Sequence, residues 1–90
     1  MMVQVNEIQP ELRERIIAIV SSISRIDAAE LKDDVLIREE LGVDSLMAME
    51  IVASCERQLN IHIDEGELYR LQTVGDFVQM VVALCSPGAV

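Results

Sequence analysis

The fold is decided by residues 44–59, DSLMAMEIVASCERQL, which contain neither proline nor glycine. Either Asp44 or Ser45 can cap the first turn, because the side-chain oxygens of both residue types accept hydrogen bonds from free amides at a helix start. Apolar side chains recur at helical spacing, and one set of them falls on a single arc about 100° wide. That set consists of Ala48, Ile51, Val52, Cys55 and Leu59. We therefore predict a helix over 44–59 that buries this arc.

A second apolar stripe on the same predicted helix consists of Leu46, Met49 and Ala53. Glu56 falls within it, and Glu50 and Arg57 border it on one side. An exposed apolar stripe beside carboxylates is typical of a docking surface for a partner. The alternative is a small bundle that packs neighbours on two sides of this helix, and periodicity alone does not choose between the two.

A helical pattern also precedes this segment. Pro10 can open a helix, because its missing N–H would have no intrahelical partner there. The apolar residues that follow at helical spacing predict a helix over 10–25. Residues 26–43 mix apolar and charged side chains, so we expect a long, partly ordered loop in which Gly42 tolerates a positive φ.

The C-terminal part of the sequence predicts one further long helix. Thr73 and Asp76 resemble a capping box, with aspartate in the position of the usual glutamate, at the start of a helix over 73–85. A short helical turn is expected near 65–70. No segment alternates in the manner of a strand, so the fold class is all-α, a small four-helix bundle of three main helices plus one short helix.

The composition limits the domain count and the kind of core. Ninety residues and 10.0 kDa leave room for one small domain over 1–90, which should bury roughly 60–65% of the surface of its unfolded chain. We place its core at about 8–85 and a short tail at 86–90. The chain is 51% hydrophobic but has only two aromatic residues, Tyr69 and Phe77, so the core must be aliphatic.

The net charge of −9 is concentrated in the middle of the chain. Residues 27–67 contain twelve acids and three bases, and the flanking segments are neutral. An acidic surface of this kind repels nucleic acid and anionic membranes and favours a monomer. No apolar run is long enough to cross a bilayer and no basic leader precedes an apolar one, so we expect no membrane insertion and a cytoplasmic protein.

The titratable residues form no catalytic or metal-binding constellation. His62 is the only histidine, and Cys55 and Cys85 have no metal-ligand spacing, so buried reduced thiols are expected. There is no paired acid and base and no phosphate-binding glycine loop. The sequence therefore predicts a protein that is not an enzyme and holds no metal.

Residues 41–46, LGVDSL, with Glu50 four residues beyond, resemble the attachment motif of the acyl carrier protein family. The resemblance continues through 63–71 and through Thr73-Val74-Gly75-Asp76, which is similar to the family's usual entry to its last helix. It covers roughly residues 8–85 and implies an acyl-carrier-like bundle. In that family the serine of the motif bears a covalent 4′-phosphopantetheine arm derived from coenzyme A.

The resemblance implies that Ser45 is the attachment residue and that Asp44 helps a phosphopantetheinyl transferase to recognise it. The position suits an attached phosphate independently of the family, because a helix N-terminus offers free N–H groups and the positive end of the helix dipole. Ser45 has no histidine to activate it, since His62 belongs to another segment, so the serine is a substrate of modification and not a nucleophilic catalyst. The implied function is to carry acyl intermediates as thioesters in fatty-acid, lipid or polyketide synthesis.

The resemblance also assigns roles to the two faces of the central helix. Acyltransferases and synthases with basic docking patches would meet the acids Asp44, Glu50 and Glu56. The stripe of Leu46, Met49 and Ala53 would supply the apolar part of that transient contact. The residues expected to line an acyl cavity are Ile51, Val52, Cys55, Ile63 and Leu71.

The sequence departs from the usual family pattern at four positions. Met47 replaces a common acid, Arg57 interrupts an acidic run, and Asp64 replaces a common proline. Gly66 weakens the short helix by roughly 1 kcal/mol relative to alanine. These changes favour a specialised carrier over a housekeeping one.

Two other functions remain as alternatives. An aminoacyl or peptidyl carrier shares the bundle and the arm, although its motif more often has two glycines before the residue that precedes serine, where this chain has Gly42 and Val43. An acidic helical interaction module without a prosthetic group would use Ser45 only as a helix cap.

Overall fold

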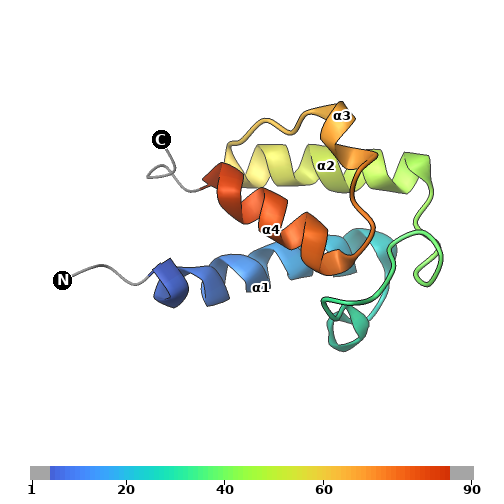
Figure 1. Ribbon diagram of the computed structural model, residues 1–90, viewed down its shortest axis with the longest axis horizontal. Coiled ribbons are helices and arrows are strands. Elements are labelled where there is room, and N and C mark those ends of the chain that lie inside the picture. The colour runs from blue at the N-terminus through green and yellow to red at the C-terminus, as the bar shows by residue number, and fades with distance from the viewer. Residues whose placement is uncertain (1–4, 86–90) are drawn as a thin grey trace.

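The computed structural model describes residues 5–85, with side chains from residue 10 onward, so the expected tail at 86–90 lies outside the described residues. The elements are α1 (Val5–Ser24), the 3₁₀ turn η1 (Ala28–Glu30), α2 (Ser45–Leu59), α3 (Glu65–Leu68) and α4 (Val74–Cys85). α1 packs against both α2 and α4, which run in the opposite direction to α1 (Figure 1). The prediction of three main helices and a short one is confirmed.

The predicted start of the first helix is wrong. α1 begins at Val5, and Pro10 lies inside it instead of opening it. A proline removes only its own amide from the helical hydrogen bonds and restricts the residue before it, so a helical turn can precede it at some energetic cost. Proline is compatible with a helix start, but it does not require the helix to start there.

α2 is capped at both ends by residues of its own sequence. Asp44 is the N-cap, and its Oδ1 accepts a hydrogen bond from the Met47 amide at 2.8 Å. Of the two predicted caps it is therefore Asp44 that acts, and Ser45 is the first helical residue. The helix ends at Asn60, whose left-handed φ of 57° is typical of a C-terminal cap.

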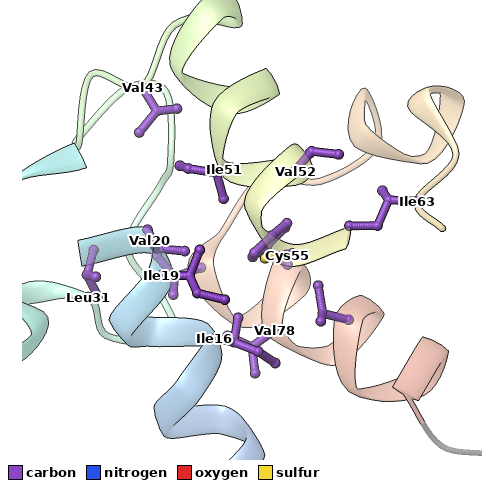
Figure 2. Packing of buried hydrophobic residues seen from close by; sticks show 13 residues of the cluster. Ile16, Ile19, Val20, Leu31, Val43, Ile51, Val52, Cys55, Ile63 and Val78 are labelled. Atoms are coloured by element: carbon purple, nitrogen blue, oxygen red, sulfur yellow. The ribbon is translucent and has the colours of Figure 1, made fainter. Parts of the chain in front are cut away.

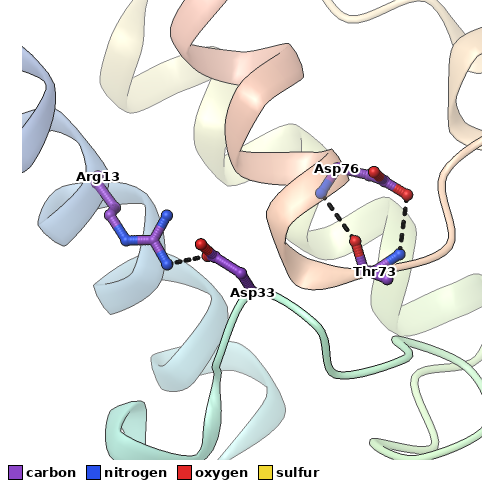
Figure 3. A network of polar contacts seen from close by, with 4 residues as sticks. All are labelled: Arg13, Asp33, Thr73 and Asp76. Carbon is purple, nitrogen blue, oxygen red and sulfur yellow. Dashed lines mark hydrogen bonds and ion pairs between the residues drawn. The ribbon is translucent and has the colours of Figure 1, made fainter.

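α4 begins with the predicted capping box. The Asp76 amide donates to Thr73 Oγ1 at 3.0 Å, and the Thr73 amide donates to Asp76 Oδ2 at 3.1 Å (Figure 3). These bonds satisfy donors that would otherwise lack partners in the first turn. Beside this cap, Asp33 of the loop between α1 and α2 pairs with Arg13, which ties the loop to α1 (Figure 3).

The long loop between α1 and α2 is more ordered than its sequence indicates. Its residues 35–37 lie against the connection between α3 and α4, where Leu36 and Thr73 form an isolated antiparallel bridge. The Ile37 amide donates to the Gln72 carbonyl at 2.9 Å, and the Val74 amide donates to the Val35 carbonyl at 3.0 Å. We call this pairing the seam. The loop then turns at Gly42, whose φ of +71° confirms the conformational role predicted for it.

The core is aliphatic, as predicted, with Phe77 as its one aromatic member. Side chains from α1, α2 and α4 converge on it, among them Ile16, Cys55 and Val78 (Figure 2). Tyr69 lies outside and is 80% exposed. No helix among the described residues is long and apolar enough to cross a membrane.

Candidate functional site

Ser45 stands at the N-terminus of α2 with an exposed side chain. The preceding Asp44 takes up two of the helix's early amides, since its carboxylate accepts from Met47 and its carbonyl oxygen from Ala48 at 2.9 Å. The Ser45 hydroxyl forms no hydrogen bond with another described residue and is free to react. A negative group bound to it would lie at the positive end of the α2 dipole.

No histidine lies beside this serine. The single histidine, His62, follows the far end of α2, where its Nδ1 lies 3.5 Å from Glu56 Oε2. Residues 5–85 also contain no cluster of three side chains able to hold a metal ion. His62 therefore lies at the opposite end of α2 from Ser45 and is not placed to activate its hydroxyl.

A cavity of about 450 Å³ opens beside Ser45, between α2, the loop before it and the α3 region. Its floor is made of buried apolar side chains from all three long helices: Val20, Ile51, Val52, Val74 and Phe77. Half-buried apolar side chains from the loop before α2, from α3 and from the connection after α3 form its walls: Ile37, Leu41, Leu68 and Leu71. The polar groups stand at its rim, where Ser45 is joined by Arg38, Asp44, Glu65 and Tyr69.

Of the five expected cavity residues, the structure places Ile51, Val52 and Leu71 on its surface. Cys55 and Ile63 are buried but do not line it. Cys55 lies one helical turn, roughly 5–6 Å, beyond Ile51 and thus farther from the opening. It packs instead near Ile16 and Ile19 of α1 (Figure 2).

The walls contain residues that sequence reasoning did not single out. Ile37 and Leu41 belong to a segment without helical or strand periodicity, so no local pattern indicated which of its side chains point inward. Leu68 lies on α3, where a helix of four residues is too short to define a face. Only the apolar character of these residues signalled burial.

The N-terminal end of the second apolar stripe of α2 is exposed to solvent. Leu46 is 71% exposed and Met49 is 43% exposed, so no described element covers this end of the stripe. Ala53, a turn farther along, is half-buried. Met49 also stands on the cavity rim, so the stripe and the cavity meet beside Ser45.

The acids assigned to docking differ in their surroundings. Asp44 and Glu50 are exposed, whereas Glu56 is partly buried and its Oε2 accepts a hydrogen bond from the Ile63 amide at 2.9 Å. Glu56 therefore fixes the loop between α2 and α3. Asp64, which replaces a proline common in the family, caps α3 by accepting from the Gly66 amide at 2.9 Å.

Both cysteines are free thiols, as predicted, but only Cys55 is buried, because Cys85 is the last residue of α4 and is half-buried. Burial, followed by negative charge on Cys85 and Glu56, raises the pKa of the Cys55 thiol from 9.0 to about 11. Partial burial also raises the pKa of Cys85. Neither is an activated nucleophile near neutral pH.

Comparison with known proteins places the site in a family context. A model of the phosphopantetheine attachment site matches residues 14–81, which span the loop, α2 and α3. The acyl carrier protein of Prochlorococcus marinus is 32% identical over 83% of this chain and 94% of its own length. The acyl carrier protein of Onion yellows phytoplasma is 35% identical over 72% of this chain and 86% of its own. A polyketide-8 synthase acyl carrier protein of Streptomyces avermitilis is 38% identical over 62% of this chain and 64% of its own.

Proposed function

Since this chain belongs to the acyl carrier protein family and carries covalently bound 4′-phosphopantetheine, we propose that Ser45 is the residue that bears the group. The observation that carries the proposal is the exposed Ser45 hydroxyl at the start of α2, on the rim of the apolar cavity. Family members are carriers and not catalysts. That role agrees with a serine that has no histidine beside it.

The residues around Ser45 fit a phosphate ester. The first-turn amides of α2 and the helix dipole favour a negative group at this position, and the attached group contributes a thiol that holds acyl chains as thioesters. Asp44 fixes the start of the helix through Met47 and keeps Ser45 exposed. We assign Asp44 a second role in recognition by the phosphopantetheinyl transferase.

The cavity supports an apolar acyl cargo. A chain attached through Ser45 reaches an opening whose floor, including Ile51 and Val52, consists of buried aliphatic side chains and Phe77. Sheltering the chain there removes apolar surface from water at roughly 25 cal/mol per Å². The names of the relatives, which are acyl and polyketide carriers, support acyl over aminoacyl cargo.

The exposed end of α2 supports a docking role toward acyl-transferring and synthase enzymes. Leu46 and Met49 provide an apolar contact, and Asp44 and Glu50 provide negative charge beside it. A basic patch on the partner would be steered to this surface by charge and held weakly, which suits a carrier that must release each partner. Ala53 and Glu56, which are less exposed, contribute at the edge of the contact.

Intact-mass spectrometry tests the attachment site. The protein is incubated with coenzyme A, magnesium and a broad-specificity phosphopantetheinyl transferase. The parent should gain one phosphopantetheinyl group, and Ser45→Ala should gain none. Ser22→Ala, which removes an exposed serine from α1, is the matched control and should be modified like the parent. Modification of Ser45→Ala would overturn the assignment. A result in which neither Ser45→Ala nor Ser22→Ala is modified would also overturn it.

The N-terminal turn of α2 also supports service in a dedicated pathway. It contains no acidic residue, and Met47 is half-buried against the core where an acid is common in the family. Partners that rely on an acid at this point would bind this carrier poorly. Reconstituted fatty-acid synthesis with the host's main carrier replaced by this one should therefore be slower, and equal rates would contradict the specialised role.

A further inference from the structure

Arg38 joins the loop before α2 to the end of α3. Its Nη2 donates to the carbonyl oxygen of Leu68 at 3.3 Å, and its Nη1 donates to that of Leu71 at 3.2 Å. Leu68 is the last residue of α3, and its carbonyl oxygen also accepts a hydrogen bond from the Leu71 amide at 3.2 Å. The planar guanidinium, with donors fixed in a fork, can hold two such carbonyls at once.

These bonds continue the seam on the side of the cavity. On one side of Arg38 the loop is paired through backbone hydrogen bonds, from the Ile37 amide to the Gln72 carbonyl and from the Val74 amide to the Val35 carbonyl. The side chain of Arg38 then connects the loop to Leu68 and Leu71. Within residues 5–85, no other side chain from outside 64–71 donates a hydrogen bond to this segment.

α3 depends on this connection because it has little else to hold it. It is four residues long and contributes no fully buried side chain. Its approach is fixed by the bond from the Ile63 amide to Glu56, and its exit by Arg38. The segment between these two anchors supplies Leu68 to the cavity wall, and Leu71 lies at the exit anchor itself.

We propose that Arg38 is a positioning residue that clasps the end of α3 over the cavity and thereby sets how long an acyl chain the cavity shelters. The inference rests on the function proposed above, since the occupant is the chain carried on Ser45. The floor of the cavity belongs to the long helices, whereas the wall formed by the half-buried Leu68 and Leu71 can move outward without disturbing the core. Release of the clasp therefore enlarges the cavity in one direction.

Hydrogen exchange of the unmodified protein tests the clasp without any cargo. Arg38→Met keeps an unbranched apolar stem and removes the guanidinium donors. Exchange of the Glu67, Arg70 and Leu71 amides, which are hydrogen-bonded within the segment, should accelerate roughly three- to tenfold, as expected for losing hydrogen bonds of ordinary strength. The amides of α1 should exchange as in the parent. Arg38→Lys, which cannot span both carbonyls, should lie in between and serves also if Arg38→Met fails to fold.

The matched control is Arg70→Met. Arg70 is an exposed cation in the same segment with no hydrogen bond from its side chain to a described residue, so its loss changes the charge equally without releasing the clasp. Exchange in this variant should follow the parent. Equal exchange at Glu67, Arg70 and Leu71 in the parent and in both Arg38 variants would overturn the proposal.

A second measurement tests the limit on chain length. The modified proteins are loaded with saturated acyl chains of increasing length, and the rate of thioester cleavage by hydroxylamine is measured for each. In the parent and in Arg70→Met, protection of the thioester should increase with chain length up to a limit. In Arg38→Met this limit should lie at longer chains, and short chains should be less protected than in the parent. Identical length profiles would overturn the proposed role of Arg38 while leaving the attachment at Ser45 intact. Failure of modification in the mass experiment would instead remove the function itself.

Discussion

The amide of Gly75 donates to the carbonyl oxygen of Asp33 at 2.9 Å, so the first turn of α4 lies directly against the backbone of the long loop. A Cβ atom at Gly75 would lie 3.0 Å from that oxygen and 3.2 Å from the Asp33 Cβ. The pairing of Asp33 with Arg13 holds the loop in place on its other side. The loop therefore cannot move away freely.

Gly75→Ala should destabilise the protein. The strain of the close contact outweighs the gain in helix propensity, and we expect a net loss of about 1 kcal/mol in the free energy of unfolding by urea. Gly66→Ala is the matched substitution, because a Cβ there would meet only the Asp64 carboxylate at 3.5 Å. It should leave stability unchanged or raise it by up to about 1 kcal/mol. Equal effects of the two substitutions would contradict the close approach.

Glu56→Ala should loosen the loop between α2 and α3. It leaves the partly buried Ile63 amide without its acceptor, which costs about 1–2 kcal/mol of unfolding free energy. Glu50→Ala, on the exposed face of the same helix, should leave stability unchanged and reduce the association rate with a basic partner at low salt. Urea unfolding and stopped-flow binding measure the two effects. A Glu56→Ala variant as stable as the parent would show that the bond contributes nothing.

Asp76 should make stability dependent on pH in the acid range. Hydrogen bonds from the backbone amides of Thr73 and then Gln72 hold the pKa of its carboxyl below the usual 3.8. A carboxyl whose pKa is depressed in the folded state adds stability above the pKa of the unfolded chain, and this stability is lost as the pH falls through the folded value. Urea unfolding from pH 7 down to pH 2 should therefore show a smaller loss in Asp76→Asn than in the parent.

The control for that series is Asp34→Asn, since the exposed Asp34 carboxylate makes no hydrogen bond with another described residue. This variant should keep the pH profile of the parent. If Asp76→Asn also follows the parent profile, the capping box does not couple to protonation.

The two thiols should differ in their rates of alkylation. Cys55 has no exposed surface, and burial raises its pKa to about 11, whereas Cys85 is only half-buried. Iodoacetamide at pH 8 should label Cys85 first and Cys55 only on the timescale of unfolding. In urea the two should react alike. Equal rates in the native protein would contradict the burial of Cys55.

The helices could be predicted because their signals are local. The apolar arc of α2, its Asp44 cap and the Thr73–Asp76 box each lie within a few residues of sequence. Pro10 misled because proline permits a helix start without imposing one. The cavity was only partly predicted, since periodicity indicated that Ile51 and Val52 are buried and the family resemblance implied that they line a cavity, but neither indicated the walls contributed by Ile37 and Leu41.

Long-range contacts account for the other features of the site that could not be predicted from the sequence. The bonds of Arg38 to Leu68 and Leu71 join segments about thirty residues apart, and no spacing within either segment announces them. Glu56 presents the same problem, because its place within an exposed stripe did not indicate that the Ile63 amide would occupy its carboxylate. When the sequence pattern places a polar side chain on an exposed face, that side chain is interpreted as a contact for a partner. Only the folded structure shows whether it instead forms a hydrogen bond within the protein.

The seam also has a consequence for the order of folding. The bridge between Leu36 and Thr73 closes a chain segment that contains the whole of α2 and α3, and it is held by few backbone bonds. Closing so long a segment costs more entropy than those bonds return on their own, so we expect the bridge to form only after α1, α2 and α4 have packed. We therefore expect the cavity beside Ser45 to be the last part of the protein to form and the first to open, with a volume that can change without unfolding the bundle.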